Sequence, residues 1–300
     1  MAWACQMYNP RTQTEVTDVE LAGDILRVAF SGLPQLKSET VQGALRELKR
    51  DHEAFRDFVN QQNHGAGNVN ACLLYPPFEA EADAALILAS QFAYAPLAGT
   101  ALMAAAAHLG QSRCVFETAA GSQVVELSKE DRKATWFTTA PERIEKIDLE
   151  GFHSHQIFNL TYVQTGLPYL VCDVDQLELD ISDHRALAKA ARQINSAVKA
   201  SESAFPSVAP EGYDNFLIMM AKQISRNNLA TVWVSDAGYV ANSAGGTGAL
   251  AVLAAYKNAV STGPVTIKAP GGNFICAITG ANAFVTAKYK IISRQRLTRL

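Results

Sequence analysis

Two segments of the sequence are apolar along their whole length, and they constrain the fold more than any other feature. "LAGTALMAAAAHLG" begins at Leu97 and "GGTGALAVLAAYKN" begins at Gly245. Each starts with glycine and threonine among small residues and continues as an alanine-rich run that favours a helix. A helix without a polar face must be enclosed by the rest of the protein. We therefore expect two lobes, each built around one such helix.

The rest of the chain repeats one plan of strands and helices in its two halves. Residues 16–30 predict a strand bent at Gly23, and residues 70–90 predict two strands joined at Pro76-Pro77. The second half again places strand pairs and an amphipathic helix before its apolar segment. We predict an α+β protein of two pseudo-symmetric lobes, each a curved barrel-like sheet around a central helix.

The predicted boundaries divide the chain near its middle. Residues 1–142 form the N-terminal lobe, with 283–300 returning to it, and residues 143–282 form the C-terminal lobe. The starts of the two central helices would then face each other across a cleft between the lobes, where we expect the functional site.

One amphipathic helix is expected over residues 38–62. Val41, Leu45 and Leu48 supply its apolar face, and the charges from Glu47 to Glu53 are expected on its solvated face.

Composition narrows the function. The chain has 300 residues, 48% hydrophobic and 18% charged, with a net charge of −3 and no basic stripe, so nucleic acid is not an expected partner. Five scattered cysteines without a CxxC pair predict small buried side chains in a reducing compartment. No signal-peptide pattern is seen at the start, so a cytoplasmic protein is expected.

One uncharged stretch, residues 84–107, could be mistaken for a membrane span. Gln91, Pro96 and Gly99 interrupt it, so a strand, a loop and a buried helix explain it better. No membrane partner is expected.

The glycine-rich starts of the two central helices are candidate anion sites. The first turn of a helix leaves N–H groups without partners in a region of partial positive charge. Glycine lets a ligand oxygen approach this backbone closely. The alternative is that the glycines only permit close packing of helix on strand. We expect substrate binding by the residues of these two starts: Gly99, Thr100, Gly246, Thr247 and Gly248.

Several motifs resemble one known family. "DVELAGDILRV" looks like Asp-x-His-Thr-Gly-Gly-Glu-Pro-x-Arg-Val, and "AYAPLAGTALMAAA" stands where the family has Gly-Tyr-x-x-Met-Cys-Gly-His-Ala. "SGLPQL" and "FETAAG" are similar to its Gly-Leu-Pro and Thr-Pro-Ala-Gly segments. "DAGYVANSAGGTGALAVLAA" stands where it has Asp-Gly-x-Val-Asp-Arg-Ser-Pro-Cys-Gly-Thr-Gly. The chain thus resembles the proline racemase and hydroxyproline epimerase/dehydratase family. "VQTGLPYLVCDVD" and "VTIKAPGGNFICAITG" are similar to pieces of diaminopimelate epimerase, whose two-lobed fold the resemblance implies.

The sequence departs from this family at the positions that carry its chemistry. Racemases of the family are expected to use two thiols, one removing and one delivering a proton. The matching positions here are Ala98 and Gly245, and Ala241 replaces the family's Asp. Thr100 and Glu20 stand where the family has histidines. A divergent member lacking both cysteines cannot racemise by two thiols. The dehydratase reaction of the family is excluded as well, because it still needs one thiol of this pair as its base. What remains is the backbone cradle for a carboxylate.

A few polar side chains remain as candidates near the site. Asp236 or His64 could act as acid or base, although a turn-forming Asp and a loop His are the plainer explanations. Asn68 and Asn70 could orient a ligand, and Tyr94 is expected to line the pocket wall.

Cofactor chemistry is not indicated. His153 and His155 lack a carboxylate or cysteine at matching spacing, so no metal is expected. "GGTG" lacks the spacing of a dinucleotide-binding loop, so no cofactor is expected.

Two functions stay open. The first is a cofactor-independent isomerase, lyase or cyclase that acts on a small carboxylate- or carbonyl-bearing metabolite in a biosynthetic pathway. Its pocket, without the thiols, would take a larger and more apolar ligand than proline. The second is a catalytically inactive binder of a small acid. A homodimer is implied by the resemblance alone.

Overall fold

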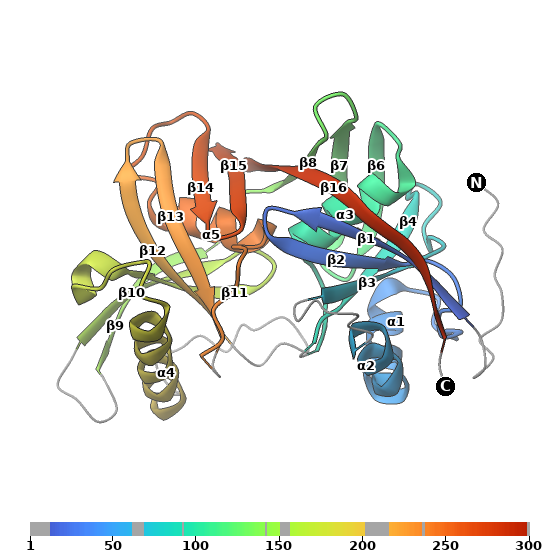
Figure 1. Ribbon diagram of the computed structural model, residues 1–300, viewed down its shortest axis with the longest axis horizontal. Helices are drawn as coiled ribbons and strands as arrows, with labels where there is room; N and C mark the ends of the chain where they lie inside the picture. Colours follow the sequence, from blue (N-terminus) through green and yellow to red (C-terminus); the bar gives the residue numbers. More distant parts are fainter. Residues whose placement is uncertain are drawn as a thin grey trace. The chain divides into compact units, whose positions relative to one another are not determined.

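The computed structural model describes residues 13–61, 69–91, 93–141, 143–150, 157–201, 216–235 and 238–298. The chain folds into two compact units. Unit 1 contains the residues up to Thr138 and those from Thr286 onward, and unit 2 contains Thr139–Val285. Figure 1 labels their elements.

Unit 1 is a closed barrel of eight strands. Its elements are β1 (Gln13–Leu21), β2 (Asp24–Ala29), α1 (Val41–Asp51), α2 (Glu53–Gln61), β3 (Val69–Tyr75), β4 (Ala84–Ala89), β5 (Tyr94–Ala95), α3 (Gly99–Leu109), β6 (Arg113–Thr118), β7 (Gly121–Ser128), β8 (Lys133–Thr139) and most of β16 (Asn282–Thr298). The strands follow the order β1-β2-β3-β4-β6-β7-β8-β16, and β16 pairs back onto β1. This pairing closes the ring and leaves no free edge.

Unit 2 repeats the strand order of unit 1. Its elements are β9 (Arg143–Glu150), β10 (Ile157–Gln164), β11 (Pro168–Asp173), the 3₁₀ turn η1 (Val174–Leu177), α4 (His184–Ala200), β12 (Leu217–Ser225), β13 (Asn228–Val234), α5 (Gly246–Ala255), β14 (Val265–Ala269), β15 (Gly272–Thr279) and the start of β16. The order runs from β16 through β15, β14, β13, β12, β11 and β10 to β9. Each unit contains two parallel pairs, β2–β3 and β4–β6 in unit 1, β11–β12 and β13–β14 in unit 2. Parallel neighbours need a crossover, which α1–α2, α3, α4 and α5 provide in turn.

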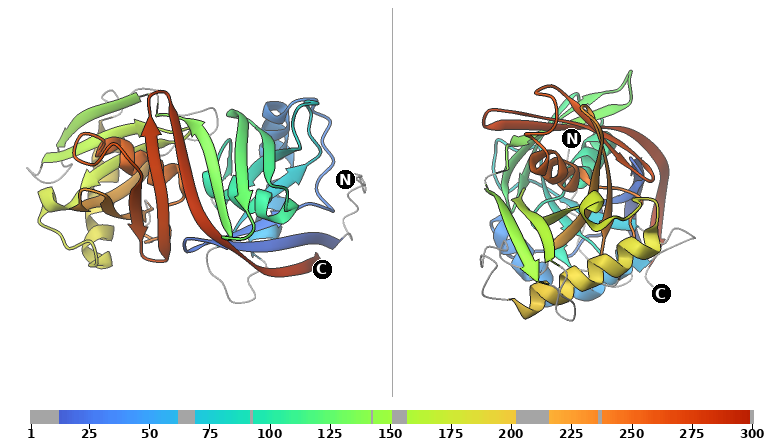
Figure 2. Two further views of the ribbon diagram at one scale, coloured as in Figure 1. Left: turned by 90° about the horizontal axis from the view of Figure 1, so that it is seen from above. Right: turned by 90° about the vertical axis from the view of Figure 1, so that its left-hand side faces the viewer.

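The two apolar helices lie at the centres of their units, as predicted. Every residue of Gly99–Ala107 in α3 is buried, and α3 contacts β1, β2, β3, β6 and β7. Every residue of Gly246–Ala254 in α5 is buried, and α5 contacts β10 through β15. Figure 2 (right) shows α5 enclosed by the strands of unit 2, while α4 lies along its outside. The α+β class and the sheet-around-helix architecture are thus confirmed.

The predicted single helix over 38–62 is instead two helices that meet at His52. The carbonyl oxygen of His52 accepts hydrogen bonds from the Tyr94 hydroxyl at 2.9 Å and from the Phe55 amide at 3.0 Å. His52 therefore ends one helix and starts the next. Both helices pack on the outer face of the unit 1 sheet, over a core that includes Leu45, Phe55 and Leu73.

Two further local expectations are corrected. Residues 16–30 form a hairpin rather than one bent strand, with Ala22 and Gly23 in the turn at φ 46° and 91°. Glu47 is buried rather than solvated, because its carboxylate accepts hydrogen bonds from the segment preceding α1.

Residues 84–107 form β4, β5 and most of α3, as expected. In the described part of the chain, no helix is long and apolar enough to cross a membrane.

Candidate functional site

The first turn of α3 offers unpartnered backbone donors in unit 1. Ala98 is the N-cap, in an extended conformation with φ −150° and ψ 120°, and no side chain caps the helix. The amides of Gly99 and Thr100 in this turn have no intrahelical acceptor. Thr100 is 5% exposed, and within the described residues its hydroxyl forms no hydrogen bond. A ligand oxygen arriving here would meet N–H groups, a hydroxyl and the positive end of the helix dipole.

This turn lies at one identifiable end of the barrel. The last turn of α3 carries His108, whose Nδ1 lies 3.0 Å from Thr17 Oγ1 at the middle of β1. The chain reaches this first turn from Ala95, which pairs with Leu88 near the end of β4, next to the start of β3. The first turn of α3 therefore lies toward the end of the barrel where the β1–β2 hairpin turns. Asn70, the second residue of β3, lies at this end, since it pairs with Leu26 near the start of β2. Its side-chain oxygen accepts a hydrogen bond from the Gln91 amide at 3.2 Å.

The first turn of α5 in unit 2 is braced by side chains. The Ser243 hydroxyl accepts a hydrogen bond from the Gly245 amide at 3.1 Å. Thr247 Oγ1 lies 2.6 Å from the Tyr169 hydroxyl, and Thr165 donates to the Thr247 carbonyl at 3.3 Å. Two lateral contacts from β11 and the turn before it thus fix this turn.

Gly248 has a packing role. A Cβ built there would lie 3.2 Å from Sδ and Cε of Met219 and 3.4 Å from a ring carbon of Tyr169. Close packing of α5 against β11 and β12 therefore accounts for this glycine without a ligand. A direct role of Gly248 in substrate binding stays a prediction.

Gly245 differs from Gly248, because its constraint is conformational. It is the N-cap of α5 with φ 66° and ψ 157°, a region that almost only glycine adopts. A Cβ at this position would meet nothing within 4 Å. Gly245, at the position of the family's second thiol, thus borders open space. Its backbone conformation, however, disfavours any residue that carries a Cβ. Ala241, where the family has an aspartate, is buried and its amide donates to the Trp233 carbonyl.

Tyr94 is fully buried in the outer core of unit 1, and its hydroxyl is bonded to His52. Burial raises the pKa of this phenol far above its ordinary value, so it stays protonated. These contacts give Tyr94 a structural role, and contact with substrate stays a prediction. Glu20, at the position of a family histidine, accepts a hydrogen bond from the Gly23 amide at 3.0 Å. His64, Asn68, Asp236, His153 and His155 lie outside the described residues.

The described thiols are unsuited to proton transfer. Cys72, Cys114, Cys172 and Cys276 are all free and buried, and none lies at the start of α3 or α5. Burial raises the pKa of Cys72 and Cys172 to about 12 and that of Cys114 to about 11. They remain neutral thiols near pH 7. Within the described ranges, no group of three or more His, Cys, Asp or Glu residues could hold a metal ion.

Sequence reasoning did not identify Tyr169 and Thr165 as supports of the α5 turn. Tyr169 is 78 residues from Thr247 along the chain, and no local pattern announces such a contact. The only available signal was the Gly-Leu-Pro corner before β11, which resembles diaminopimelate epimerase.

Comparisons with known proteins agree with this architecture. A 4-hydroxyproline 2-epimerase from Rhizobium etli is 27% identical over 225 residues, which cover 67% of this chain and 65% of the epimerase. The crystal structure of a hydroxyproline epimerase from Agrobacterium vitis, solved with trans-4-hydroxy-L-proline, superposes with a TM-score of 0.80 at 22% identity. That likeness covers 99% of this chain and 94% of that one. Methylitaconate Δ-isomerase has a TM-score of 0.54 at 14% identity, covering 96% of both chains.

Most of the sequence also matches the model of one protein family. The model described as "Proline racemase" matches residues 16–270, which span both units and the starts of both central helices. The protein is a divergent member of the proline racemase family.

Proposed function

We propose that the protein is a cofactor-independent isomerase, lyase or cyclase that acts on a small carboxylate- or carbonyl-bearing metabolite without thiol chemistry. One observation carries the proposal. The first turns of α3 and α5 keep glycine and threonine, while the N-cap positions that bear thiols in the family are Ala98 and Gly245.

The α3 turn supports binding of a negatively charged or polarised oxygen. The first-turn amides have no side-chain cap, and the Thr100 hydroxyl belongs to the same turn. Hydrogen bonds to a carbonyl or carboxylate oxygen withdraw electron density and stabilise an enolate-like transition state. Binding there would also hold one reactive conformer of the substrate.

The proton-moving group is proposed to be Asp236 or His64, with Asn68 and Asn70 orienting the ligand. This assignment follows the resemblance. Asp236 stands nine residues before Gly245, where diaminopimelate epimerase has a substrate-contacting acid, and His64 lies one position out of register with the family's Gly-His-x-Asp motif. Buried, neutral cysteines leave no competing thiolate among the described residues.

A ligand larger and more apolar than proline is proposed. The missing side chain at Gly245 leaves open space where the family has a thiol, and Ala98 contributes only a methyl group. The relative and the crystal structure named for hydroxyproline therefore suggest the class of ligand, a small carboxylate, rather than its size.

The first experiment incubates the protein with amino and hydroxy acids in heavy water and follows deuterium at the α-carbon by NMR. We expect no exchange with proline or 4-hydroxyproline. Exchange with either would show that a proton is removed despite Ala98 and Gly245, and would end the proposal of altered chemistry.

The second experiment tests the turn of α5. Gly246→Val should abolish ligand binding and turnover while circular dichroism shows a folded protein, although its unfolding midpoint should fall because Gly246 is buried. Lys268→Val on β14, outside the turn, serves as the matched control. Full activity of Gly246→Val would contradict the proposed role.

The second candidate is a catalytically inactive protein that binds a small acid, favoured by the same loss of thiols. It predicts saturable binding of a carboxylate with no change in the ligand over many hours. Chemical conversion of any bound ligand, lost in Asp236→Asn or His64→Gln, would exclude it.

A further inference from the structure

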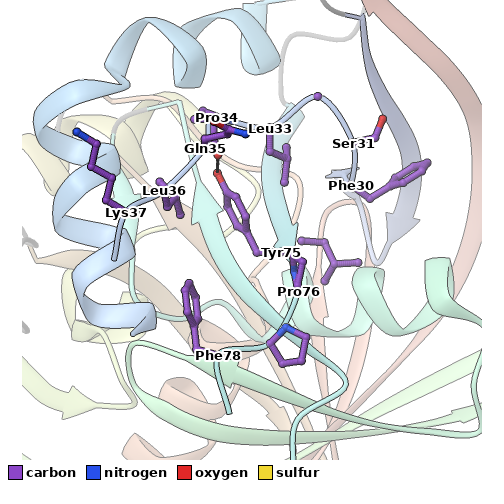
Figure 3. Close-up of a pocket in the computed structure, with 13 residues that line it drawn as sticks. Phe30, Ser31, Leu33, Pro34, Gln35, Leu36, Lys37, Tyr75, Pro76 and Phe78 are labelled. Atoms are coloured by element: carbon purple, nitrogen blue, oxygen red, sulfur yellow. Dashed lines mark hydrogen bonds between the residues drawn. The ribbon is translucent and has the colours of Figure 1, made fainter. Parts of the chain in front are cut away.

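Unit 1 contains a pocket of about 680 Å³ that no residue of α3 or α5 lines. Two segments form it, Phe30–Lys37 after β2 and Leu74–Phe78 at the end of β3 (Figure 3). Its volume falls within the range of about 300–1,000 Å³ that is typical of small-molecule sites. Most lining side chains are leucine, proline or aromatic, so the pocket offers flat, rigid apolar walls.

The two walls are tied together across the pocket. The Tyr75 hydroxyl donates to the carbonyl oxygen of Pro34 at 3.2 Å, and Figure 3 shows this bond as a dashed line. Gly32 fixes the start of the first wall at φ 64°, where a Cβ would lie 2.5 Å from the Gln13 carbonyl oxygen. The segment after β2 is therefore anchored at two points.

Two buried carboxylates hold the far ends of the walls. Glu47, 8% exposed, accepts hydrogen bonds from the Lys37 amide at 3.0 Å and from the Ser38 hydroxyl at 2.7 Å. Glu117, 6% exposed, accepts from the amides of Phe78 and Glu79 at 2.9 and 3.2 Å. Burying a carboxylate is costly unless hydrogen bonds compensate it. Both of these carboxylates fix a pocket wall, so the pocket is formed before any ligand binds.

The interior of the pocket carries no charge. Lys37 is the one charged lining residue; it is exposed, and in Figure 3 its side chain runs away from Tyr75. An ionised ligand would lose its hydration without gaining a partner here, which favours a neutral ligand.

The Tyr75 hydroxyl defines the polar contact. Burial raises the pKa of Tyr75 well above its ordinary value, so the phenol keeps its proton. That proton is used in the bond to Pro34. The hydroxyl oxygen can still accept a hydrogen bond, so a matching ligand supplies an N–H or O–H donor.

We propose that this pocket is a second binding site, which takes a neutral, ring-shaped organic molecule bearing one hydrogen-bond donor. Aromatic and proline walls suit a flat ring, and Tyr75 suits its donor. The inference is independent of the chemistry proposed for α3 and α5.

Indole is a suitable probe because it is flat, neutral and carries one N–H. Titration of the full chain, followed by ligand-observed NMR, should show saturable binding of indole. Indole-3-carboxylate should bind at least ten-fold more weakly. No binding of indole at millimolar concentration, or equal binding of the carboxylate, would overturn the proposal.

Two variants locate the site. Leu36→Trp fills the pocket from its half-buried wall and should weaken indole binding at least ten-fold. Ile224→Trp, at an exposed position of β12 in unit 2, should leave binding unchanged. Tyr75→Phe should weaken indole several-fold while 1-methylindole, which has no N–H, binds both proteins alike. Unchanged indole binding in folded Leu36→Trp would place the ligand elsewhere and refute the assignment.

Discussion

Arg27 and Asp18 face one another across the β1–β2 hairpin and form a two-point ion pair, with Nε 2.8 Å from Oδ1 and Nη2 3.0 Å from Oδ2. Their exposures are 3% and 6%. Ser293 and Gln295 of β16 also donate to Asp18 Oδ2, at 3.1 and 2.8 Å, and Arg27 Nη1 donates to the Val59 carbonyl at 3.0 Å. The pair thereby joins β1, β2, β16 and α2, and it fastens the strand that closes the barrel.

Removing one member of this pair should destabilise unit 1 strongly. Asp18→Ala leaves a buried guanidinium without its carboxylate, so we expect the free energy of unfolding to fall by about 3–5 kcal/mol. Urea denaturation followed by circular dichroism measures it. The exposed pair Arg50–Asp51 provides the control, because solvent screens this pair and Asp51→Ala should leave the urea midpoint nearly unchanged. Equal effects of the two substitutions would contradict this account.

Ala22 occupies a turn conformation that suits glycine. Its φ is 46°, and the stretch it belongs to resembles a family motif with glycine at this point. Ala22→Gly should therefore raise the free energy of unfolding by about 1 kcal/mol, because it relieves the left-handed strain. Ala29→Gly, in an ordinary strand position of β2, should lower stability by a similar amount. A lower urea midpoint for Ala22→Gly would refute the strain argument.

The central features of the fold were predictable because they are local in sequence. α3 and α5 lack polar faces, so burial at the centre of a sheet follows from hydrophobicity alone. Gly110 ends α3 in the left-handed conformation, which is a common way for a helix to stop at glycine.

The predictions from sequence were wrong where contacts between residues far apart in the sequence determine the local structure. The helix break at His52 depends on Tyr94, 42 residues away, and the burial of Glu47 depends on amides of the segment before α1. At the site, resemblance located Ala98 and Gly245, but the bracing of Thr247 by Tyr169 could not be read from either segment alone. The roles of Asp236 and His64 stay predictions.

Acid should destabilise unit 1 through His108. Burial, followed by the nearby Arg294, lowers the pKa of this imidazole from 6.5 to about 4, and Phe30 stacks on the ring at 4.4 Å. The unfolded chain therefore binds a proton between pH 6.5 and 4 that the folded chain does not. The associated stability is complete above pH 6.5 and is lost as the pH falls toward 4, by about 1–2 kcal/mol between pH 7 and pH 5.

His108→Gln isolates this contribution. The variant should lose some stability at pH 7, together with the contact to Thr17. The further loss on going to pH 5 should be smaller than in wild type, as measured by urea midpoints at both pH values. Parallel pH profiles of the two proteins would show that another group is responsible.

A cysteine should be tolerated at the start of α3 but should destabilise the protein at the start of α5. Ala98 is half-buried and extended, a conformation any side chain adopts, so Ala98→Cys should fold with nearly unchanged stability. Gly245→Cys has open space for its side chain but forces a residue with a Cβ into φ 66° and ψ 157°. That strain should cost about 1–3 kcal/mol.

The thiol in Ala98→Cys is expected to have a lowered pKa, because the helix start stabilises a thiolate. Its iodoacetamide labelling, followed by mass spectrometry against pH, should rise at lower pH than labelling of Ser112→Cys, at an exposed position after α3. Cys5→Ser serves as the background for both variants, because Cys5 lies outside the described residues while the other four cysteines are buried. Identical pH profiles for the two thiols would show that the first turn of α3 does not stabilise a negative charge, and the proposed carboxylate cradle would lose its physical basis.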